Sequence, residues 1–91
     1  MRTNSRGKQI DNLNNVAGSD VLAGYEPATR DENSGATSYY GFVDSDGNWY
    51  IMREVPTGSV TEDDFIRGTT NFATNWTGRA GLSYQKFNLV F

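Results

Sequence analysis

The stretch SYYGFVDSDGNWYIMRE, residues 38–54, decides the fold. Two runs rich in aromatic and β-branched residues flank the turn-forming sequence Asp44-Ser45-Asp46-Gly47. Runs of this kind, joined by a short link that contains Gly, are typical of a β-hairpin. Alternation in the second run places Trp49 and Ile51 on one face, and Tyr50 and Met52 on the other. Because both faces carry large apolar groups, one should pack on the domain's own core. The other should be covered by a helix, by an N-terminal arm or by another subunit.

The residues after the hairpin extend the same pattern. Pro56-Thr57-Gly58-Ser59 predicts a second turn, and residues 60–67 predict a third strand that ends at the sequence Gly68-Thr69-Thr70-Asn71. The three adjacent acids Glu62, Asp63 and Asp64 are expected to lie on a solvated edge.

The C-terminal segment has apolar residues at helical spacing. They are Trp76, Ala80, Tyr84, Phe87 and Phe91. This spacing predicts a helix over about residues 75–87, capped by Thr74 or Asn75. Gly78 and Gly81 oppose a helix, and the alternation of residues 80, 82 and 84 leaves a further strand as the alternative. In either case the core is expected to include Trp76, Tyr84, Phe87, Leu89 and Phe91.

Residues 1–37 form a region of different composition, rich in Asn, Gly, Ser, Asp and Thr. Its apolar residues are too few and too widely spaced to offset the entropy lost on ordering. We therefore predict an extended arm that lies across a neighbouring subunit, with folding back onto its own domain as the alternative. The expected anchors of the arm are Ile10, Leu13, Val16 and Leu22.

Together these patterns predict a mainly-β or small α+β protein. Residues 38–91 should form a three-stranded antiparallel meander with a C-terminal helix or a further strand, and residues 1–37 should form the extended N-terminal arm.

Composition argues against catalysis. The chain of 91 residues has no Cys and no His, which removes disulfides, the commonest general base and the commonest metal ligands. The sequence Asp44-Ser45-Asp46-Gly47-Asn48 fails the spacing of a calcium loop. Adjacent acids at 62–64 do not supply two carboxylates across a sheltered cleft. We expect no enzymatic activity, no cofactor, no bound metal and no small-molecule ligand.

The charge distribution is uneven. The first eight residues contain Arg2, Arg6 and Lys8 and no acid, so the other 83 carry five basic and eleven acidic side chains, a balance of −6. An acidic body does not favour nucleic-acid binding, which requires clustered Lys and Arg. No apolar run has the length of a membrane span or of a secretory signal. We therefore expect synthesis in a host cytoplasm without a signal peptide, and neither a membrane nor a nucleic acid as partner.

A resemblance extends over residues 38–91. It rests on Tyr40-Gly41-Phe42-Val43-Asp44, Asp46-Gly47-Asn48-Trp49-Tyr50-Ile51-Met52-Arg53, Gly68, Thr74-Asn75-Trp76-Thr77, Arg79-Ala80, Tyr84, Phe87 and Phe91. In these residues the chain resembles short proteins encoded among the structural genes of tailed bacteriophages. The resemblance implies a virion component of a tail, fibre or capsid surface, and it implies no catalytic residues.

The predicted function is therefore that of a structural subunit of a bacteriophage virion, acting through packing with copies of itself and with other virion proteins. The candidate interface residues are Ile10, Leu13, Val16, Leu22, Tyr40, Trp49, Tyr50 and Met52. One alternative is a receptor- or glycan-binding module, in which exposed aromatic rings would stack on sugars. Another is a small intracellular adaptor that counters a host protein.

Overall fold

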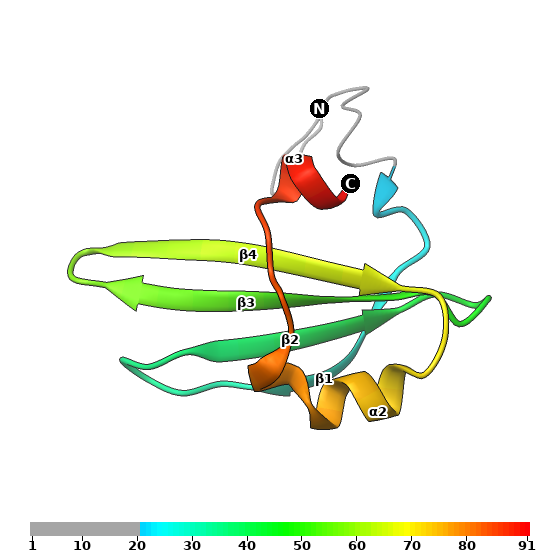
Figure 1. Ribbon diagram of the computed structural model, residues 1–91, viewed down its shortest axis with the longest axis horizontal. Coiled ribbons are helices and arrows are strands. Elements are labelled where there is room, and N and C mark those ends of the chain that lie inside the picture. The colour runs from blue at the N-terminus through cyan, green and yellow to red at the C-terminus, as the bar shows by residue number, and fades with distance from the viewer. Residues whose placement is uncertain (1–20) are drawn as a thin grey trace, which may run out of the picture.

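The computed structural model describes residues 21–91, which form one antiparallel sheet of four strands in the order β1-β2-β3-β4 (Figure 1). The strands are β1 (Glu26–Asp31), β2 (Ser38–Val43), β3 (Trp49–Thr57) and β4 (Val60–Gly68). They are followed by α2 (Phe72–Thr77), the 3₁₀ turn η1 (Arg79–Gly81) and α3 (Phe87–Val90). The prediction of a mainly-β meander is confirmed, with one strand more than expected.

The hairpin of β2 and β3 is built as its sequence predicts. The backbone N–H groups of Asp46 and Asn48 each donate to Asp44 Oδ1 at 2.9 Å, and Asn48 Nδ2 donates to Asp44 Oδ2 at 2.8 Å. Gly47 has a φ of 88°, which a residue with a side chain rarely adopts. The turn thus uses both oxygens of the Asp44 carboxylate. These hydrogen bonds lower the pKa of Asp44, and the one from the Asn48 side chain has the largest effect.

The second turn is shorter than predicted. Thr57 pairs with Val60, so that Gly58-Ser59 alone connects β3 to β4, with Gly58 at a φ of 66°. Pro56 was expected in this turn but lies within β3, opposite Thr61. The strand tolerates it there because the pairing of β2 with β3 ends at Glu54, which leaves that side of β3 without a partner strand.

Strand β1 lies in the segment that composition assigned to the arm. It pairs with β2 from Glu26 opposite Val43 to Asp31 opposite Tyr39, with a bulge between Pro27 and Thr29. The folded domain therefore begins before residue 38. Its polar sequence hid the strand, because an edge strand needs few apolar side chains when its backbone is paired along one side.

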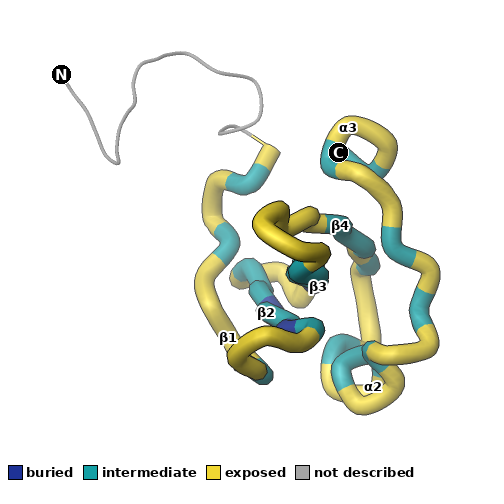
Figure 2. The backbone as a smooth tube through the Cα atoms, turned by 90° about the vertical axis from the view of Figure 1, so that its left-hand side faces the viewer, coloured by how far each residue is buried: buried dark blue, intermediate teal, exposed yellow. Residues whose placement is uncertain are grey.

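The predicted helix over residues 75–87 is wrong. Helix α2 ends at Thr77, where Gly78 N–H donates to the carbonyl of Thr74, and its N-terminal cap is Asn71, not Thr74 or Asn75. The chain then passes around the edge of the sheet, where Gln85 forms a single β-bridge to Phe65, and ends in α3 (Figures 1 and 2). Neither the long helix nor the further strand forms, because the segment covers both faces of the sheet and has to bend around β4.

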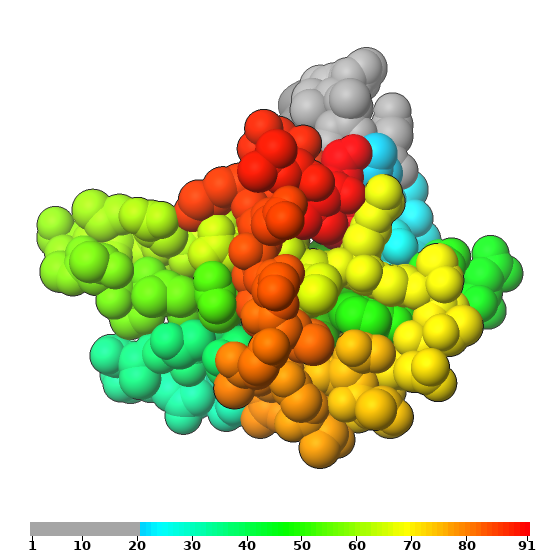
Figure 3. Space-filling model, viewed as in Figure 1, coloured from blue at the N-terminus to red at the C-terminus, as the bar shows by residue number. Residues whose placement is uncertain are grey.

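One face of the sheet, here called the α2 face, carries Trp49 and Ile51, which are 3% and 0% exposed. Phe72 and Trp76 of α2 lie over Gly41 on this face so closely that a Cβ atom there would come within 2.6 Å of Phe72 Cζ. The C-terminal segment continues across the same face (Figure 3). The α2 face therefore holds the most deeply buried part of the core.

The opposite face, here called the Tyr40 face, is covered only in part. Tyr50 is 7% exposed, and its ring lies 4.6 Å from that of Phe42, 5.0 Å from that of Tyr25 and 5.4 Å from that of Phe91. The Phe87 ring of α3 lies 5.4 Å from Phe65 of β4. The segment that leads into β1 and helix α3 thus cover the half of this face nearest the β2–β3 turn.

Four of the five predicted C-terminal core residues, Trp76, Tyr84, Phe87 and Phe91, are half-buried. Leu89 was predicted in the core but is 67% exposed. Helix α3 has a single turn, so that only the side occupied by Phe87 and Phe91 can rest on the sheet.

Candidate functional site

The structure divides the predicted interface residues. Ile10, Leu13 and Val16 lie outside the described residues, and Leu22 is half-buried just before β1. Tyr40 and Met52 are half-buried and lie side by side on the Tyr40 face, as partners of β2 and β3.

Trp49 and Tyr50 are only 3% and 7% exposed within the described residues. Both are buried in the protein's own core, Trp49 beside Phe72 of α2 and Tyr50 between Tyr25 and Phe91. The alternation of the hairpin correctly separates these two rings onto opposite faces. It does not show that other parts of the same chain cover both of them.

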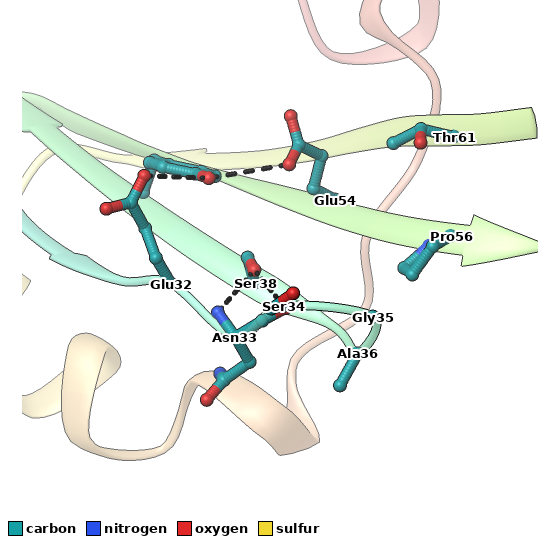
Figure 4. A pocket seen from close by; sticks show the side chains of 10 residues that line it. Glu32, Asn33, Ser34, Gly35, Ala36, Ser38, Glu54, Pro56 and Thr61 are labelled. Atoms are coloured by element: carbon teal, nitrogen blue, oxygen red, sulfur yellow. Dashed lines mark hydrogen bonds between the residues drawn. The ribbon is translucent and has the colours of Figure 1, made fainter.

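The half of the Tyr40 face away from the β2–β3 turn is hollowed (Figure 4). We call its larger depression, of about 470 Å³, the acidic hollow; it is lined by residues 32–36 of the β1–β2 loop and by Ser38, Tyr40, Glu54, Pro56 and Thr61. A second depression of about 270 Å³, the β1 hollow, is lined by residues 27–30, Tyr40 and Phe42. Tyr40 lines both and stands at the centre of the site.

Two carboxylates bracket the hydroxyl group of Tyr40. Its oxygen lies 3.3 Å from Glu32 Oε2 and 3.4 Å from Glu54 Oε1 (Figure 4). A phenol has one hydrogen to donate, so it can satisfy only one of the two carboxylates at a time. Desolvation first, and then the charges of Glu54 and Glu32, raise the pKa of Tyr40. The site is therefore rich in hydrogen-bond acceptors and short of donors.

The β1–β2 loop holds Glu32 over the sheet. Ser38 Oγ accepts from the backbone N–H of Asn33 at 2.8 Å, and the Asn33 side chain donates to Thr37 O at 3.0 Å and to Asp31 Oδ1 at 3.2 Å. Ser38 is 5% exposed, and Gly35 turns the chain at a φ of 74°. This local network makes the wall of the acidic hollow a defined part of the fold.

The acids of β4 are divided between the two faces. Asp64 on the α2 face lies 3.0 Å from Arg53 Nη2 and 2.9 Å from Lys86 Nζ, and Glu62 also lies 2.9 Å from Lys86. The hydrogen bond from Lys86, followed by that from Arg53, lowers the pKa of Asp64. The acids at 62–64 were predicted to form a solvated edge. On the α2 face, Glu62 and Asp64 instead form ion pairs that link β4 to the C-terminal segment through Lys86.

Among residues 21–91, the acids of the Tyr40 face lack ion pairs as close as these. Asp63 lies directly opposite Glu54 across β3 and β4, a pairing of like charges that destabilises a sheet. Within residues 21–91, no cation lies within salt-bridge distance of either carboxylate. Glu32 has Arg30 at 3.8 Å, with both side chains more than half exposed, a pair that contributes little. Within residues 21–91, the half of this face away from the β2–β3 turn therefore holds three acids, Glu32, Glu54 and Asp63, and one base, Arg30.

Both edges of the sheet are protected against strand addition. On β1, Pro27 and the adjacent bulge interrupt the hydrogen-bonding row. On β4, Phe65 already exchanges hydrogen bonds with Gln85, at 2.7 and 2.9 Å.

Other site chemistry has no support in the described part of the chain. There, no group of three or more His, Cys, Asp or Glu residues is placed to hold a metal ion. None of the helices between residues 21 and 91 is long and apolar enough to cross a membrane. Comparison of the sequence with family models and curated proteins, and of the fold with solved structures, finds no match.

Part of the site was missed from the sequence. The opposition of Glu54 and Asp63 could have been found, because a two-residue turn at Gly58-Ser59 determines the register of β3 and β4. The position of Glu32 could not, because it depends on a strand that composition concealed.

Proposed function

We propose that this protein is a non-catalytic structural subunit that assembles by packing the uncovered half of its Tyr40 face against other subunits. Following the resemblance of residues 38–91, we place that assembly in the virion of a tailed bacteriophage. Its partners are then further copies of this chain and other virion proteins.

One observation carries the proposal: the uneven covering of the sheet. Among the described residues, the chain's own aromatic rings and ion pairs cover the α2 face except near the β3–β4 turn, where Val60 is 56% exposed, and they cover half of the Tyr40 face. The remaining half presents the half-buried side chains of Tyr40, Met52 and Pro56 beside Glu54 and Asp63, which have no cation of residues 21–91 within salt-bridge distance. A small domain without disulfides gains stability when such a surface is covered by a partner.

The burial of the tryptophan and tyrosine rings disfavours the glycan-binding alternative. The candidate rings for this alternative are Tyr39, Tyr40, Trp49, Tyr50 and Trp76, and of these Trp49 and Tyr50 are buried in the protein's own core. Tyr39, Tyr40 and Trp76 are half-buried, so that each exposes only part of its ring to a sugar. The adaptor alternative is tested separately, because an adaptor would be absent from purified particles.

The test is the molar mass of the full chain by size-exclusion chromatography with light scattering, over a range of concentrations. We expect an oligomer for the wild type and a monomer for Met52→Lys, which puts a charge in the uncovered half of the Tyr40 face. Val60→Lys is the matched control, because Val60 is 56% exposed on the opposite face of the same sheet, and it should assemble normally. A wild type that is monomeric at every concentration, or an oligomer that Met52→Lys leaves intact, contradicts self-assembly through this face.

A further inference from the structure

We infer that the uncovered half of the Tyr40 face is the docking site for the basic N-terminal segment of a second copy of this chain. The inference rests on the proposed function, and it names the partner that the face receives.

Charge complementarity is the first argument. Residues 1–8 contain Arg2, Arg6 and Lys8 and no acid. The docking face holds Glu32 and Glu54 around one phenol hydroxyl, and Asp63 opposite Glu54. Lys and Arg side chains supply several N–H donors each, which is what two carboxylates competing for one phenol hydrogen need. A bound cation would also offset the repulsion between Glu54 and Asp63.

The apolar pattern of the segment suits the surface next to the acids. Ile10, Leu13 and Val16 follow the basic residues along the chain. The β1 hollow, formed in part by Pro27, Tyr40 and Phe42, adjoins the acidic hollow through the Tyr40 ring. A segment whose basic tip lies in the acidic hollow would bring its apolar residues towards the β1 hollow, where they would lose contact with water.

Chain length permits an exchange between copies. The twenty residues before Val21 can span at most roughly 70 Å when extended. The nine residues of β3 measure about 30 Å. The segment is therefore long enough to leave its own domain and reach the same face of a neighbour. Because each copy offers one segment and one face, repeated exchange can close into a symmetric ring.

Charge reversal on the full chain tests the inference. One variant, R2E/R6E/K8E, makes the segment acidic, and a second, E32K/E54K, makes the face basic. Each alone places like charges together, and we expect its dissociation constant for self-association to rise at least about tenfold. Mixing the two variants restores opposite charges at both contacts, so the mixture should assemble. The association should also weaken as salt is added.

A matched control keeps the charge change but moves it off the face. E26K/D46K alters two exposed acids, one on the α2 side of β1 and one in the β2–β3 turn, and should assemble like the wild type. Circular dichroism and tryptophan fluorescence confirm that each variant is folded before its mass is measured.

The outcomes separate the two proposals. If the wild type is an oligomer and both charge variants remain oligomers, self-assembly stands and this docking site is wrong. If only E32K/E54K dissociates, the face binds another part of the neighbour, and the inference fails. A third outcome is a mixture that stays monomeric while one chain carrying all five substitutions recovers the wild-type dependence of self-association on salt. The segment would then dock on its own domain, which also overturns the inference. A monomeric wild type refutes self-assembly itself.

Discussion

Gly68→Ala should be one of the most damaging small substitutions in this protein. Gly68 lies opposite Trp49 in the sheet, and a Cβ atom added to it would come 2.6 Å from Cε2 and 3.0 Å from Nε1 of the indole ring. Ordinary contacts of a Cβ atom lie at 3.4–4 Å, so that the ring has to move. It has little room, because Phe72 packs beside it and its Nε1–H donates to the carbonyl of Thr70 at 2.7 Å.

The cost has two parts. Forcing an extra methyl group into a packed core costs about 1–3 kcal/mol. Displacing the ring lengthens the hydrogen bond of Trp49 Nε1, and a buried donor left without a partner costs about 1–3 kcal/mol more. Replacing Gly by Ala also lowers the conformational entropy of the unfolded chain, which raises the free energy of unfolding by about 0.4–1 kcal/mol. We expect Gly68→Ala to lower the free energy of unfolding by about 2–4 kcal/mol.

Urea denaturation followed by far-ultraviolet circular dichroism measures this loss directly. For a domain of this size the midpoint of thermal unfolding should fall by at least about 10 °C. Gly81→Ala is the matched control, because an added Cβ meets nothing within 4 Å there, and it should be neutral or slightly stabilising. If Gly68→Ala unfolds like the wild type, the Trp49 ring is not held against β4, and the packing derived for the α2 face is wrong.

Three further predictions concern the C-terminal segment and its ion pairs. Asp64→Asn should destabilise the fold by on the order of 1 kcal/mol or more, since it weakens two charge-assisted hydrogen bonds, whereas Asp63→Asn should be neutral or stabilising. Because the pKa of Asp64 is lowered in the folded state, its contribution is present above the unfolded pKa of about 4 and is lost on further acidification. The gap between wild type and Asp64→Asn should therefore close at low pH in thermal melts. Burial raises the pKa of Tyr84 to about 12, so its contribution to stability should be complete below about pH 10 and lost as pH rises towards 12. The measurement is the absorbance of tyrosinate during a pH titration of the wild type and of Tyr84→Phe. If the difference between the two shows that Tyr84 ionises near the ordinary tyrosine pKa, the prediction is refuted. Gln85→Pro removes the N–H that donates to Phe65 O at 2.9 Å. It should increase amide hydrogen exchange in α3 while leaving the β2–β3 hairpin protected, and unchanged exchange in α3 would contradict the role of this bridge.

Much of the sheet could be predicted because its signals are local. The Asp44 carboxylate closes the β2–β3 turn using atoms within four residues of it, and Gly47 supplies the positive φ that the turn requires. Alternation along residues 49–52 then assigns each side chain to a face without knowledge of the rest of the chain. The third predicted strand follows from the same two rules.

The candidate site was predicted only in part, since its geometry depends on distant segments. Tyr40 and Met52 could be named from the hairpin alone, and both lie, half-buried, on the surface that residues 21–91 leave uncovered. Trp49 and Tyr50 were named by the same reasoning, but α2, Tyr25 and Phe91 cover them.

The sequence by itself determined the hairpin, the meander and the absence of Cys and His chemistry, because these depend on residue type and short-range spacing. Only the tertiary structure decided which surface residues 21–91 leave uncovered. The C-terminal segment bends around β4 to cover both faces near the β2–β3 turn, and β1 adds a polar edge that brings Glu32 to Tyr40. Packing between residues far apart in the chain makes those choices, and no local pattern encodes them.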